Sequence, residues 1–172
     1  MELKILTTDD VEYYIEDIYE CYADNLKIFD NQNPLGGMNK EGICNFVKSF
    51  CTGGDSLVFA VTSGQFLYGL YILDNIRYGA MNKSCGEVHM ALSRHLWGKQ
   101  AVEWGKKFLA VSPVSTLYCM VPSCCPAVIK LCKDAGFKKT GYIPNALPYK
   151  PLNSMVDRLY DIQILTYQRE DK

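Results

Sequence analysis

The sequence predicts a mixed α/β fold, in which a central sheet of six to seven strands is flanked by about four helices. Three observations predict it: three adjacent β-prone segments, an alternation of strands and helices after them, and a closing pair of strands. Adjacent strands pair antiparallel, whereas strand–helix–strand units pair parallel, so the sheet should be mixed with helices on both faces. The 172 residues, of which 48% are hydrophobic, suit one domain over residues 1–172.

The N-terminal third should contain one strand and two helices. Residues 2–7 form a β-prone strand, and apolar residues at helical spacing predict a helix from Thr8 to about Asn25, with Asp9 and Glu12 at capping-box spacing. A second helix is expected over residues 40–50, after a stretch at 31–37 whose composition is typical of a loop. The first helix has an acidic face that could attract a cationic amine but is more simply a solvated face; its residues are Glu12, Glu16, Asp17 and Glu20.

Turn residues and hydrophobic periodicity predict the remaining elements. Ser63-Gly64 is a hairpin signal, Pro126 opens a helix, and Gly136 closes it. Residues 74–83 are expected to form a longer loop or an irregular strand end. The other elements are strands at 56–62, 65–73, 87–92, 115–121, 137–142 and 159–166, and helices at 97–111 and 127–135.

Composition argues against several classes of function. The formal net charge is −1, with 18 basic and 19 acidic residues, so the chain lacks the basic excess of most nucleic-acid binders. No apolar run approaches the roughly 20 residues that span a bilayer, and the first residues lack the apolar region of a signal peptide. We therefore expect a cytoplasmic protein with no nucleic-acid partner and no membrane partner.

The eight cysteines are expected to be free thiols. A disulfide framework normally requires export, for which the sequence carries no signal. Zinc sites usually contain paired C-x-x-C spacings, whereas the close pair here is the adjacent Cys124-Cys125, and the histidines are His89 and His95 alone. We expect no metal, and cysteines that serve as small apolar residues.

The segment from Glu87 to Ala101 predicts an anion site. A strand runs into a turn at Trp97 and Gly98 that opens a helix, so main-chain N–H groups at the helix start point toward a bound anion. Glycine lets the backbone approach a phosphate closely. The segment resembles a motif of the GNAT superfamily of N-acetyltransferases, Gln/Arg-x-x-Gly-x-Gly/Ala, which binds the pyrophosphate of coenzyme A. Two positions depart from that pattern, which here carries His95 first and Gln100 last.

A second segment, Cys125 to Phe137, is similar to a later motif of the same superfamily. In that motif a helix ends in a Leu-Gly-Phe-like step, which here is Ala135-Gly136-Phe137. Members often carry Asn at the place of Cys125 and Tyr at the place of Cys132, and that Tyr commonly protonates the departing thiolate. The two segments cover roughly residues 85–140, so the resemblance implies the GNAT fold without identifying the acceptor.

The resemblance also implies a site. Members splay the strands equivalent to 87–92 and 115–121, so a V-shaped opening that admits the pantetheine is expected there. The residues implied in binding acetyl-CoA, the co-substrate, are Ala91, Leu92, His95, Trp97, Gly98, Lys99, Gln100 and Ala101.

Three residues are candidates for the chemistry. Glu87 is the candidate base, and His89 lies two residues on, hence on the same face of the strand. Cys132 is the candidate thiol acid, with Tyr142 and Tyr149 as alternative proton donors. Each of the three also has an ordinary structural explanation, namely a solvated strand end, a packed histidine and a core cysteine.

Two functions remain open. One is an active acetyl-CoA-dependent N-acyltransferase that acts on a small amine or a protein amine, and the intact turn at Trp97 and Gly98 favours it. The other is a catalytically inactive relative that serves in binding or assembly, which the changes at Gln100, Cys125 and Cys132 favour. Compact, divergent members of this kind occur in bacteriophages, where some act in head assembly or against host defence. The acceptor, the protein partner and the choice between monomer and homodimer do not follow from the sequence.

Overall fold

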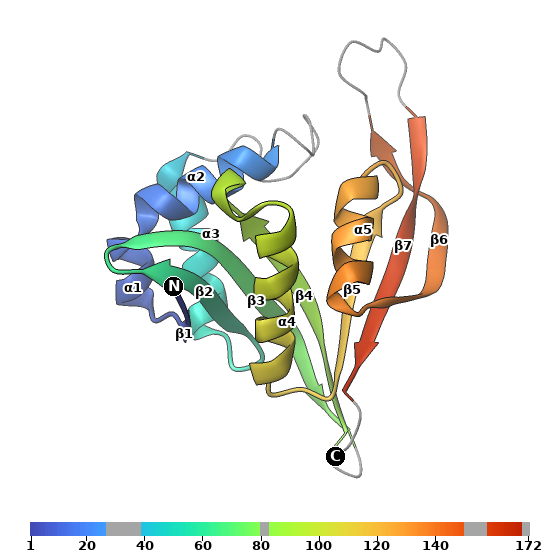
Figure 1. Ribbon diagram of the computed structural model, residues 1–172, viewed down its shortest axis with the longest axis horizontal. Coiled ribbons are helices and arrows are strands. Elements are labelled where there is room, and N and C mark those ends of the chain that lie inside the picture. Colours follow the sequence, from blue (N-terminus) through green and yellow to red (C-terminus); the bar gives the residue numbers. More distant parts are fainter. Residues whose placement is uncertain (27–38, 80–82, 150–157, 170–172) are drawn as a thin grey trace.

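Seven strands form one sheet in the order β1-β2-β3-β4-β5-β7-β6 (Figure 1). The computed structural model describes residues 1–26, 39–79, 83–149 and 158–169. Neighbouring strands run antiparallel except β4 and β5, which are parallel because a helix connects them. The strands are β1 (Glu2–Ile5), β2 (Leu57–Ser63), β3 (Phe66–Tyr78), β4 (Ser84–Leu92), β5 (Thr116–Pro122), β6 (Lys138–Tyr149) and β7 (Arg158–Gln168). The predicted mixed sheet is thereby confirmed.

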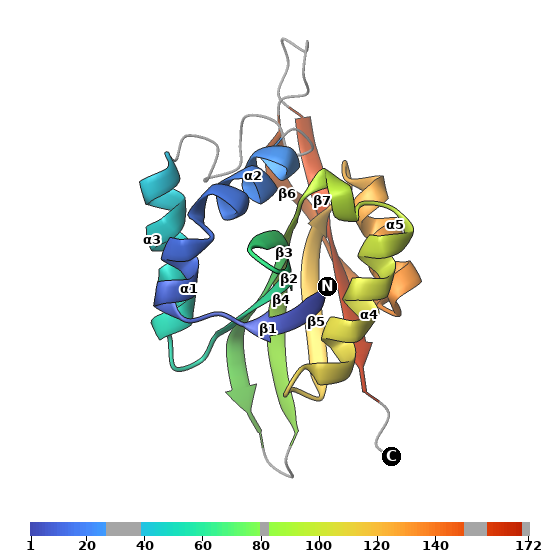
Figure 2. The same cartoon turned by 60° about the vertical axis from the view of Figure 1, so that its left-hand side comes forward.

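Helices cover both faces of this sheet (Figures 1 and 2). The first three helices lie on one face over the N-terminal strands, and the last two lie on the other face. Within the described ranges the helices are α1 (Thr8–Tyr13), α2 (Ile15–Leu26), α3 (Lys40–Thr52), α4 (Lys99–Val111) and α5 (Pro126–Ala135), with a 3₁₀ turn at Arg94–Leu96.

Two hydrophobic clusters result, one on each face. Side chains alternate along β2, so Val58 and Ala60 pack with α1–α3, whereas Phe59 and Val61 pack with α4. The apolar face of α4 is buried; its residues are Ala101, Trp104, Phe108 and Leu109. The site described below lies in the second cluster, between the sheet and α4 and α5.

The predicted first helix is in fact two helices, and Tyr14 separates them. Its backbone has φ −97° and ψ 16°, outside the regular helical geometry. The Tyr14 N–H donates to the Asp10 carbonyl at 3.0 Å, and its carbonyl accepts from the Ile18 N–H at 2.9 Å. Tyr14 therefore ends α1 and begins α2. Val11, Tyr14 and Ile18 all pack into one cluster, so their spacing does not reveal the bend.

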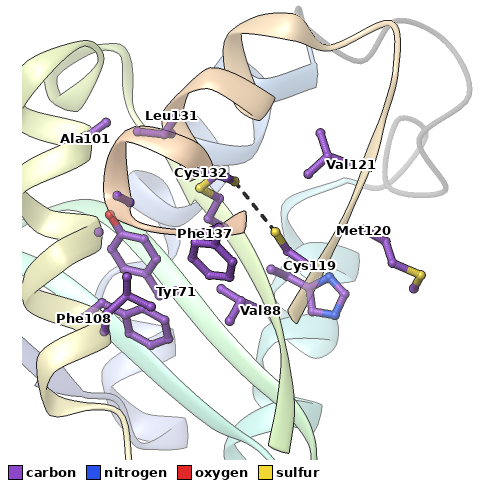
Figure 3. A pocket seen from close by; sticks show the side chains of 15 residues that line it. Tyr71, Val88, Ala101, Phe108, Cys119, Met120, Val121, Leu131, Cys132 and Phe137 are labelled. Atoms are coloured by element: carbon purple, nitrogen blue, oxygen red, sulfur yellow. Dashed lines mark hydrogen bonds between the residues drawn. The ribbon is translucent and has the colours of Figure 1, made fainter. Parts of the chain in front are cut away.

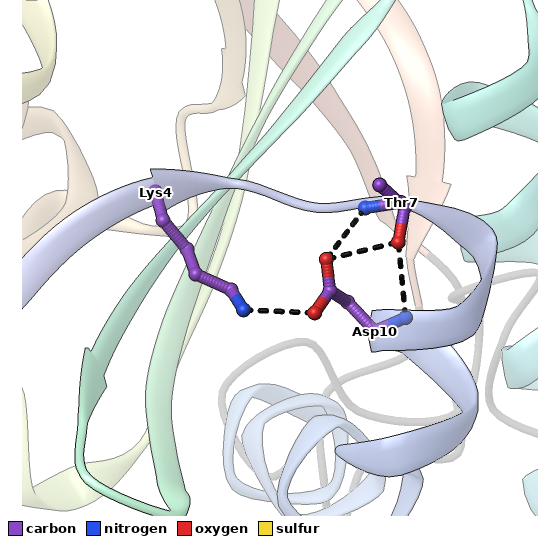
Figure 4. Close-up of polar contacts among 3 residues, drawn as sticks. All are labelled: Lys4, Thr7 and Asp10. Carbon is purple, nitrogen blue, oxygen red and sulfur yellow. Dashed lines mark hydrogen bonds and ion pairs between the residues drawn. The ribbon is translucent and has the colours of Figure 1, made fainter.

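The N-terminal cap also differs from the prediction: it is formed by Thr7 and Asp10, not by Asp9 and Glu12 (Figure 4). The Asp10 N–H donates to Thr7 Oγ1 at 3.2 Å, and Asp10 Oδ2 accepts from the Thr7 N–H at 2.9 Å. Lys4 Nζ donates to Asp10 Oδ1 at 2.8 Å. Asp10 therefore accepts hydrogen bonds from the N-cap N–H and from a lysine together, which makes this cap favourable.

The acidic face of the first helices is only partly a solvated surface. Asp17 Oδ2 accepts a hydrogen bond from the Leu67 N–H at 2.7 Å, which fastens α2 to β3. Glu12 and Glu16 remain exposed, but their carboxylates pair with Lys48 and Lys40 of α3. These contacts hold the three helices together, so this face needs no amine to explain it.

Several strands are longer than predicted because bulges interrupt their patterns. β3 continues to Tyr78 through a register shift between Asp74 and Arg77, where Asn75 has φ 52°. β4 begins at Ser84 and β6 extends to Tyr149, with two register shifts against β7. In the part of the chain described here, no helix is long and apolar enough to span a membrane.

Candidate active site

β4 and β5 pair at one end and separate at the other. β4 runs to Leu92 and β5 to Pro122, but the last residues in register are Glu87 and Tyr118. The complete set of pairs is Cys85 with Thr116, Gly86 with Leu117, and Glu87 with Tyr118. The predicted V-shaped opening between these strands is therefore confirmed.

Two serines fasten the closed end of the opening. The Ser84 N–H donates to Ser115 Oγ at 3.0 Å, and the Ser115 N–H donates to Ser84 Oγ at 3.1 Å. Ser115 Oγ in turn donates to the Ser84 carbonyl at 2.8 Å. These three hydrogen bonds between Ser84 and Ser115 hold the two strands together at the closed end of the opening.

A pocket of about 120 Å³ continues the opening toward α4 and α5 (Figure 3). Its walls are mainly apolar and come from β3, β4, β5, α4 and α5; they include Val88, Met90, Val121, Leu131 and Phe137. An apolar cleft with a few polar groups is the usual form of a small-molecule site.

Tyr71 places an unsatisfied hydroxyl in this pocket. The residue is 3% exposed, and its ring stacks on Phe108 with centroids 4.8 Å apart. Its Oη has no hydrogen-bond partner among the described residues, and burial raises the pKa of the phenol. An orphaned buried hydroxyl costs free energy, so a bound ligand that hydrogen-bonds to it would recover that cost.

The turn before α4 has the features of an anion site. Gly98 has φ 76° and ψ −132°, and no side chain caps the helix start. A Cβ atom at Gly98 would meet nothing within 4 Å, so the position needs glycine for its backbone angle and faces open space. Trp97 Nε1 donates to the Leu92 carbonyl at 3.1 Å and fixes the turn to the end of β4.

The residues implied in binding acetyl-CoA fall into two groups. Lys99 and Gln100 are exposed beside Gly98, Trp97 is 45% exposed, and Ala101 is buried in the pocket wall. The other residues make contacts within the protein. The side chains of Ala91 and Leu92 are buried in the two hydrophobic clusters. The His95 N–H donates to Ser93 Oγ at 3.2 Å. Gln100 is the second residue of α4, and its side chain is exposed.

Glu87 and His89 lie together on the face of the sheet that carries α1–α3. His89 Nε2 is 3.8 Å from Glu87 Oε1, with side chains 48% and 10% exposed respectively. Both side chains lie on the same face of β4, as their alternation along the strand predicts. A half-exposed imidazole beside a nearly buried carboxylate could carry protons between that carboxylate and solvent.

Glu87 belongs to a polar row that crosses three strands. Asp74 of β3 is its register partner on one side, and Tyr118 of β5 is its partner on the other. Burial, followed by the Glu87 charge, raises the pKa of Tyr118. Arg77 of β3 also acts on Tyr118, in the direction that lowers this pKa.

Cys132 lies on the other face, beside a second thiol. The Cys119 thiol donates to Cys132 Sγ at 3.8 Å, and both residues line the pocket (Figure 3). This hydrogen bond lowers the pKa of Cys132 and raises that of Cys119. Glu87 thus lies on the opposite face of the sheet from Cys132, whereas His89 also lines the pocket that contains Cys132.

The sequence prediction overlooked Asp74, Tyr71 and Cys119. The alternation along β5 places Cys119 on the same face as its buried neighbours, but only the tertiary structure brings it to α5. The alternative donor Tyr142 is 61% exposed on β6, which β7 separates from β5. The side chain of Tyr149 lies outside the described residues.

The cysteines show no disulfide, and all eight are free thiols. Across the described ranges, no group of three or more His, Cys, Asp or Glu side chains could hold a metal ion. The thiol environments differ, because four cysteines are buried, namely Cys21, Cys119, Cys125 and Cys132.

No protein-family model matches the chain, and no curated protein matches it significantly. Solved structures do share its fold. An acetyltransferase of the GNAT family from Streptococcus pneumoniae is 10% identical with a TM-score of 0.65, and the match covers 98% of this chain and 99% of that one.

Two further solved structures have named substrates. A spermidine N-acetyltransferase from Vibrio cholerae, in complex with CoA and spermine, is 17% identical with a TM-score of 0.68, covering 97% of this chain and 94% of that one. A ribosomal-protein-S5-alanine acetyltransferase from Vibrio fischeri is 13% identical with a TM-score of 0.68, covering 98% and 93%. At these identities the likeness establishes the fold: the chain has the GNAT acetyltransferase fold.

Proposed function

We propose that the protein is a cytoplasmic, acetyl-CoA-dependent N-acyltransferase that acts on an amine. The observation that carries the proposal is the divergence of β4 and β5 beyond Glu87. The open edge of β4 leads directly into the turn at Gly98, whose helix start carries no side-chain cap. An opening of this shape beside an anion site suits a long thioester with a phosphate-bearing end.

The residues present fit acetyl-CoA. The N–H groups at the start of α4 would hold the pyrophosphate, because the helix dipole and the open space at Gly98 favour an anion there. The pantetheine would lie along β4 beyond Glu87, where β5 no longer pairs with that edge. The unpartnered hydroxyl of Tyr71 offers one further hydrogen bond within the pocket.

The acid and base groups lie on opposite faces of the opening. Acetyl-CoA supplies an activated acetyl group as its thioester. Glu87 would take a proton from the ammonium of the acceptor, directly or through His89, so that the neutral amine can attack. Cys132, which accepts the Cys119 hydrogen bond in the resting protein, would give its thiol proton to the leaving thiolate.

The carboxylates support an amine as the acceptor. Asp74 and Glu87 are register partners, and Glu87 is 8% exposed. A cationic amine at this row would relieve the repulsion between the two carboxylates before reaction. The GNAT-fold neighbours named above include acetyltransferases of amines, which supports this assignment without identifying the acceptor.

Calorimetric titration with acetyl-CoA tests the proposal, followed by thiol-release assays over a panel of primary amines. We expect binding at micromolar concentration and amine-dependent release of CoA. Desulfo-CoA and free adenosine serve as controls for the thioester and the nucleotide. Failure of acetyl-CoA to bind at millimolar concentration would contradict the proposal.

A second candidate is a catalytically inactive protein that keeps the fold for binding or assembly, as in a divergent bacteriophage member. The thiols at Cys125 and Cys132 favour it, because the resemblance implies Asn and Tyr at those places. Cys125 is the N-cap residue of α5, and its side chain caps nothing. Binding of acetyl-CoA without turnover of any amine would favour this second candidate.

A further inference from the structure

Two thiols from different elements face each other in the pocket wall. Cys119 belongs to β5 and Cys132 to α5, and their sulfur atoms are 3.8 Å apart (Figure 3). Each residue is 6% exposed, and both line the pocket. We propose that this pair is an oxidation site, at which a peroxide converts the two thiols into a reversible Cys119–Cys132 disulfide.

The position of the two sulfur atoms suits that bond. The two cysteines are 13 residues apart in the sequence, and they sit on a strand and on the helix packed over it. A disulfide requires the sulfur atoms to approach to about 2.05 Å, with Cα atoms about 4.4–6.8 Å apart. The sulfurs already touch, so the bond requires their separation to fall from 3.8 Å to about 2.05 Å.

A second pair in the same chain provides a matched comparison. The sulfurs of Cys124 and Cys125 are 3.9 Å apart, nearly the same separation. These residues are adjacent, so their Cα atoms are fixed about 3.8 Å apart by a trans peptide bond. That spacing falls below the range for an unstrained disulfide, so this pair should resist cross-linking.

The chemistry balances with hydrogen peroxide as the oxidant. Cys132 is the attacking sulfur, because the hydrogen bond from Cys119 favours its thiolate. The thiolate attacks one peroxide oxygen and forms a sulfenic acid, and the second oxygen leaves with a proton as water. Cys119 then attacks the sulfenic sulfur, the S–S bond forms, and a second water leaves. Two thiols lose two electrons in total, and peroxide gains them.

Oxidation would act on the proposed catalytic site. The disulfide removes the Cys132 thiol proton and ties β5 to α5 at the pocket wall. A dithiol reductant restores both groups. In a reducing cytoplasm the pair would rest as thiols and form the bond only during oxidative stress.

Peptide mapping of the full chain tests the inference without acetyl-CoA. The reduced protein is treated with hydrogen peroxide, blocked with N-ethylmaleimide under denaturing conditions, and digested without reductant. We expect one linked peptide pair that contains Cys119 and Cys132, a protein mass lower by two hydrogens, and reversal by dithiothreitol. Because no CoA compound is present, this outcome is independent of the proposed transferase activity.

Variants make the result specific. Cys119→Ser and Cys132→Ser should each lose the link, whereas the double variant with Cys124→Ser and Cys125→Ser should keep it. A link between Cys124 and Cys125 in place of the expected one would overturn the inference. So would conversion of Cys132 to sulfinic acid without a link, or survival of both thiols after peroxide treatment.

Discussion

Glu87 and Tyr118 are the last register pair between β4 and β5, and the two strands separate immediately beyond them. Residues in register on neighbouring parallel strands share a face, so the carboxylate and the phenol stand side by side where the opening begins. Asp74 extends the same row on β3. The proposed proton acceptor therefore lies where an amine on this face would meet the opening.

Glu87→Gln should abolish most of the transferase activity. The amide keeps the shape of the side chain but accepts no proton, and loss of a general base typically lowers kcat by about 10²–10⁴-fold. The Kd for acetyl-CoA should change little, because Glu87 lies on the face proposed for the acceptor. Steady-state thiol release with calorimetry separates the two effects. Glu103→Gln, on the exposed face of α4, is the matched control. An unimpaired kcat in Glu87→Gln would refute the role of Glu87 as the base.

Gly98→Asp should weaken acetyl-CoA binding by more than tenfold. A carboxylate about 4 Å from a phosphate repels it by about 4 kcal/mol at an effective dielectric constant near 20. Gly98→Ala provides the comparison, because φ 76° strains both variants whereas only one adds charge. Calorimetry at two salt concentrations measures the difference, which should shrink at high salt.

Gln100→Gly provides a second comparison at the same turn. The Gln100 side chain is exposed, so its removal should preserve or improve binding of acetyl-CoA, although helix stability falls by roughly 1 kcal/mol.

The Gly98 variants can also contradict the proposal. Equal affinity for acetyl-CoA in Gly98→Asp and Gly98→Ala would show that no phosphate lies at this turn.

Asp10→Asn should destabilise the protein at neutral pH but not in strong acid. The hydrogen bond from Lys4, followed by that from the Thr7 N–H, lowers the pKa of Asp10 below its ordinary 3.8. A depressed folded pKa contributes stability above the unfolded pKa, and this contribution is lost as the pH falls through the folded pKa. Asp10 is the third residue of α1, so loss of its charge near the helix start should cost about 0.3–1 kcal/mol at pH 7.

Urea unfolding of wild type and variant from pH 7 down to pH 2 measures this effect. The difference in free energy of unfolding should stay constant down to about pH 5 and then disappear toward pH 2. The exposed Asp9 lies in the same helical turn, so Asp9→Asn serves as the control. A difference that persists unchanged at pH 2 would show that the charge of Asp10 contributes nothing.

Local sequence patterns predicted most of the elements, because turn residues and periodicity are local properties. The αL geometry of Gly136 and the buried face of α4 correspond to what their residues indicate. The bend at Tyr14 was missed because hydrophobic periodicity continues through it. The bonding of Asp17 to the Leu67 N–H was also missed, since it joins residues 50 apart.

The site was less accessible to such reasoning than the fold. Glu87 and His89 are close because they alternate along one strand, which a sequence can show. Tyr71, Cys119 and Cys132 meet only after β3, β5 and α5 pack together. The pocket is thus a product of tertiary structure, whereas the turn at Gly98 is a local motif.

Tyr71→Phe should have opposite effects on the free protein and on its complex. The hydroxyl is buried without a hydrogen-bond partner among the described residues, and such a group costs about 1–3 kcal/mol. Its removal should therefore leave the free energy of unfolding of the unliganded protein unchanged or higher. If acetyl-CoA satisfies the hydroxyl, the variant loses one net hydrogen bond of about 0.5–1.5 kcal/mol, and its Kd rises roughly 2- to 12-fold.

Urea unfolding and calorimetry measure the two effects of Tyr71→Phe. Tyr22→Phe, in the other hydrophobic cluster, should leave the Kd for acetyl-CoA unchanged. A stabilised variant with wild-type affinity would show that the ligand does not reach Tyr71, whereas a destabilised one would show that the hydroxyl has a partner in the free protein.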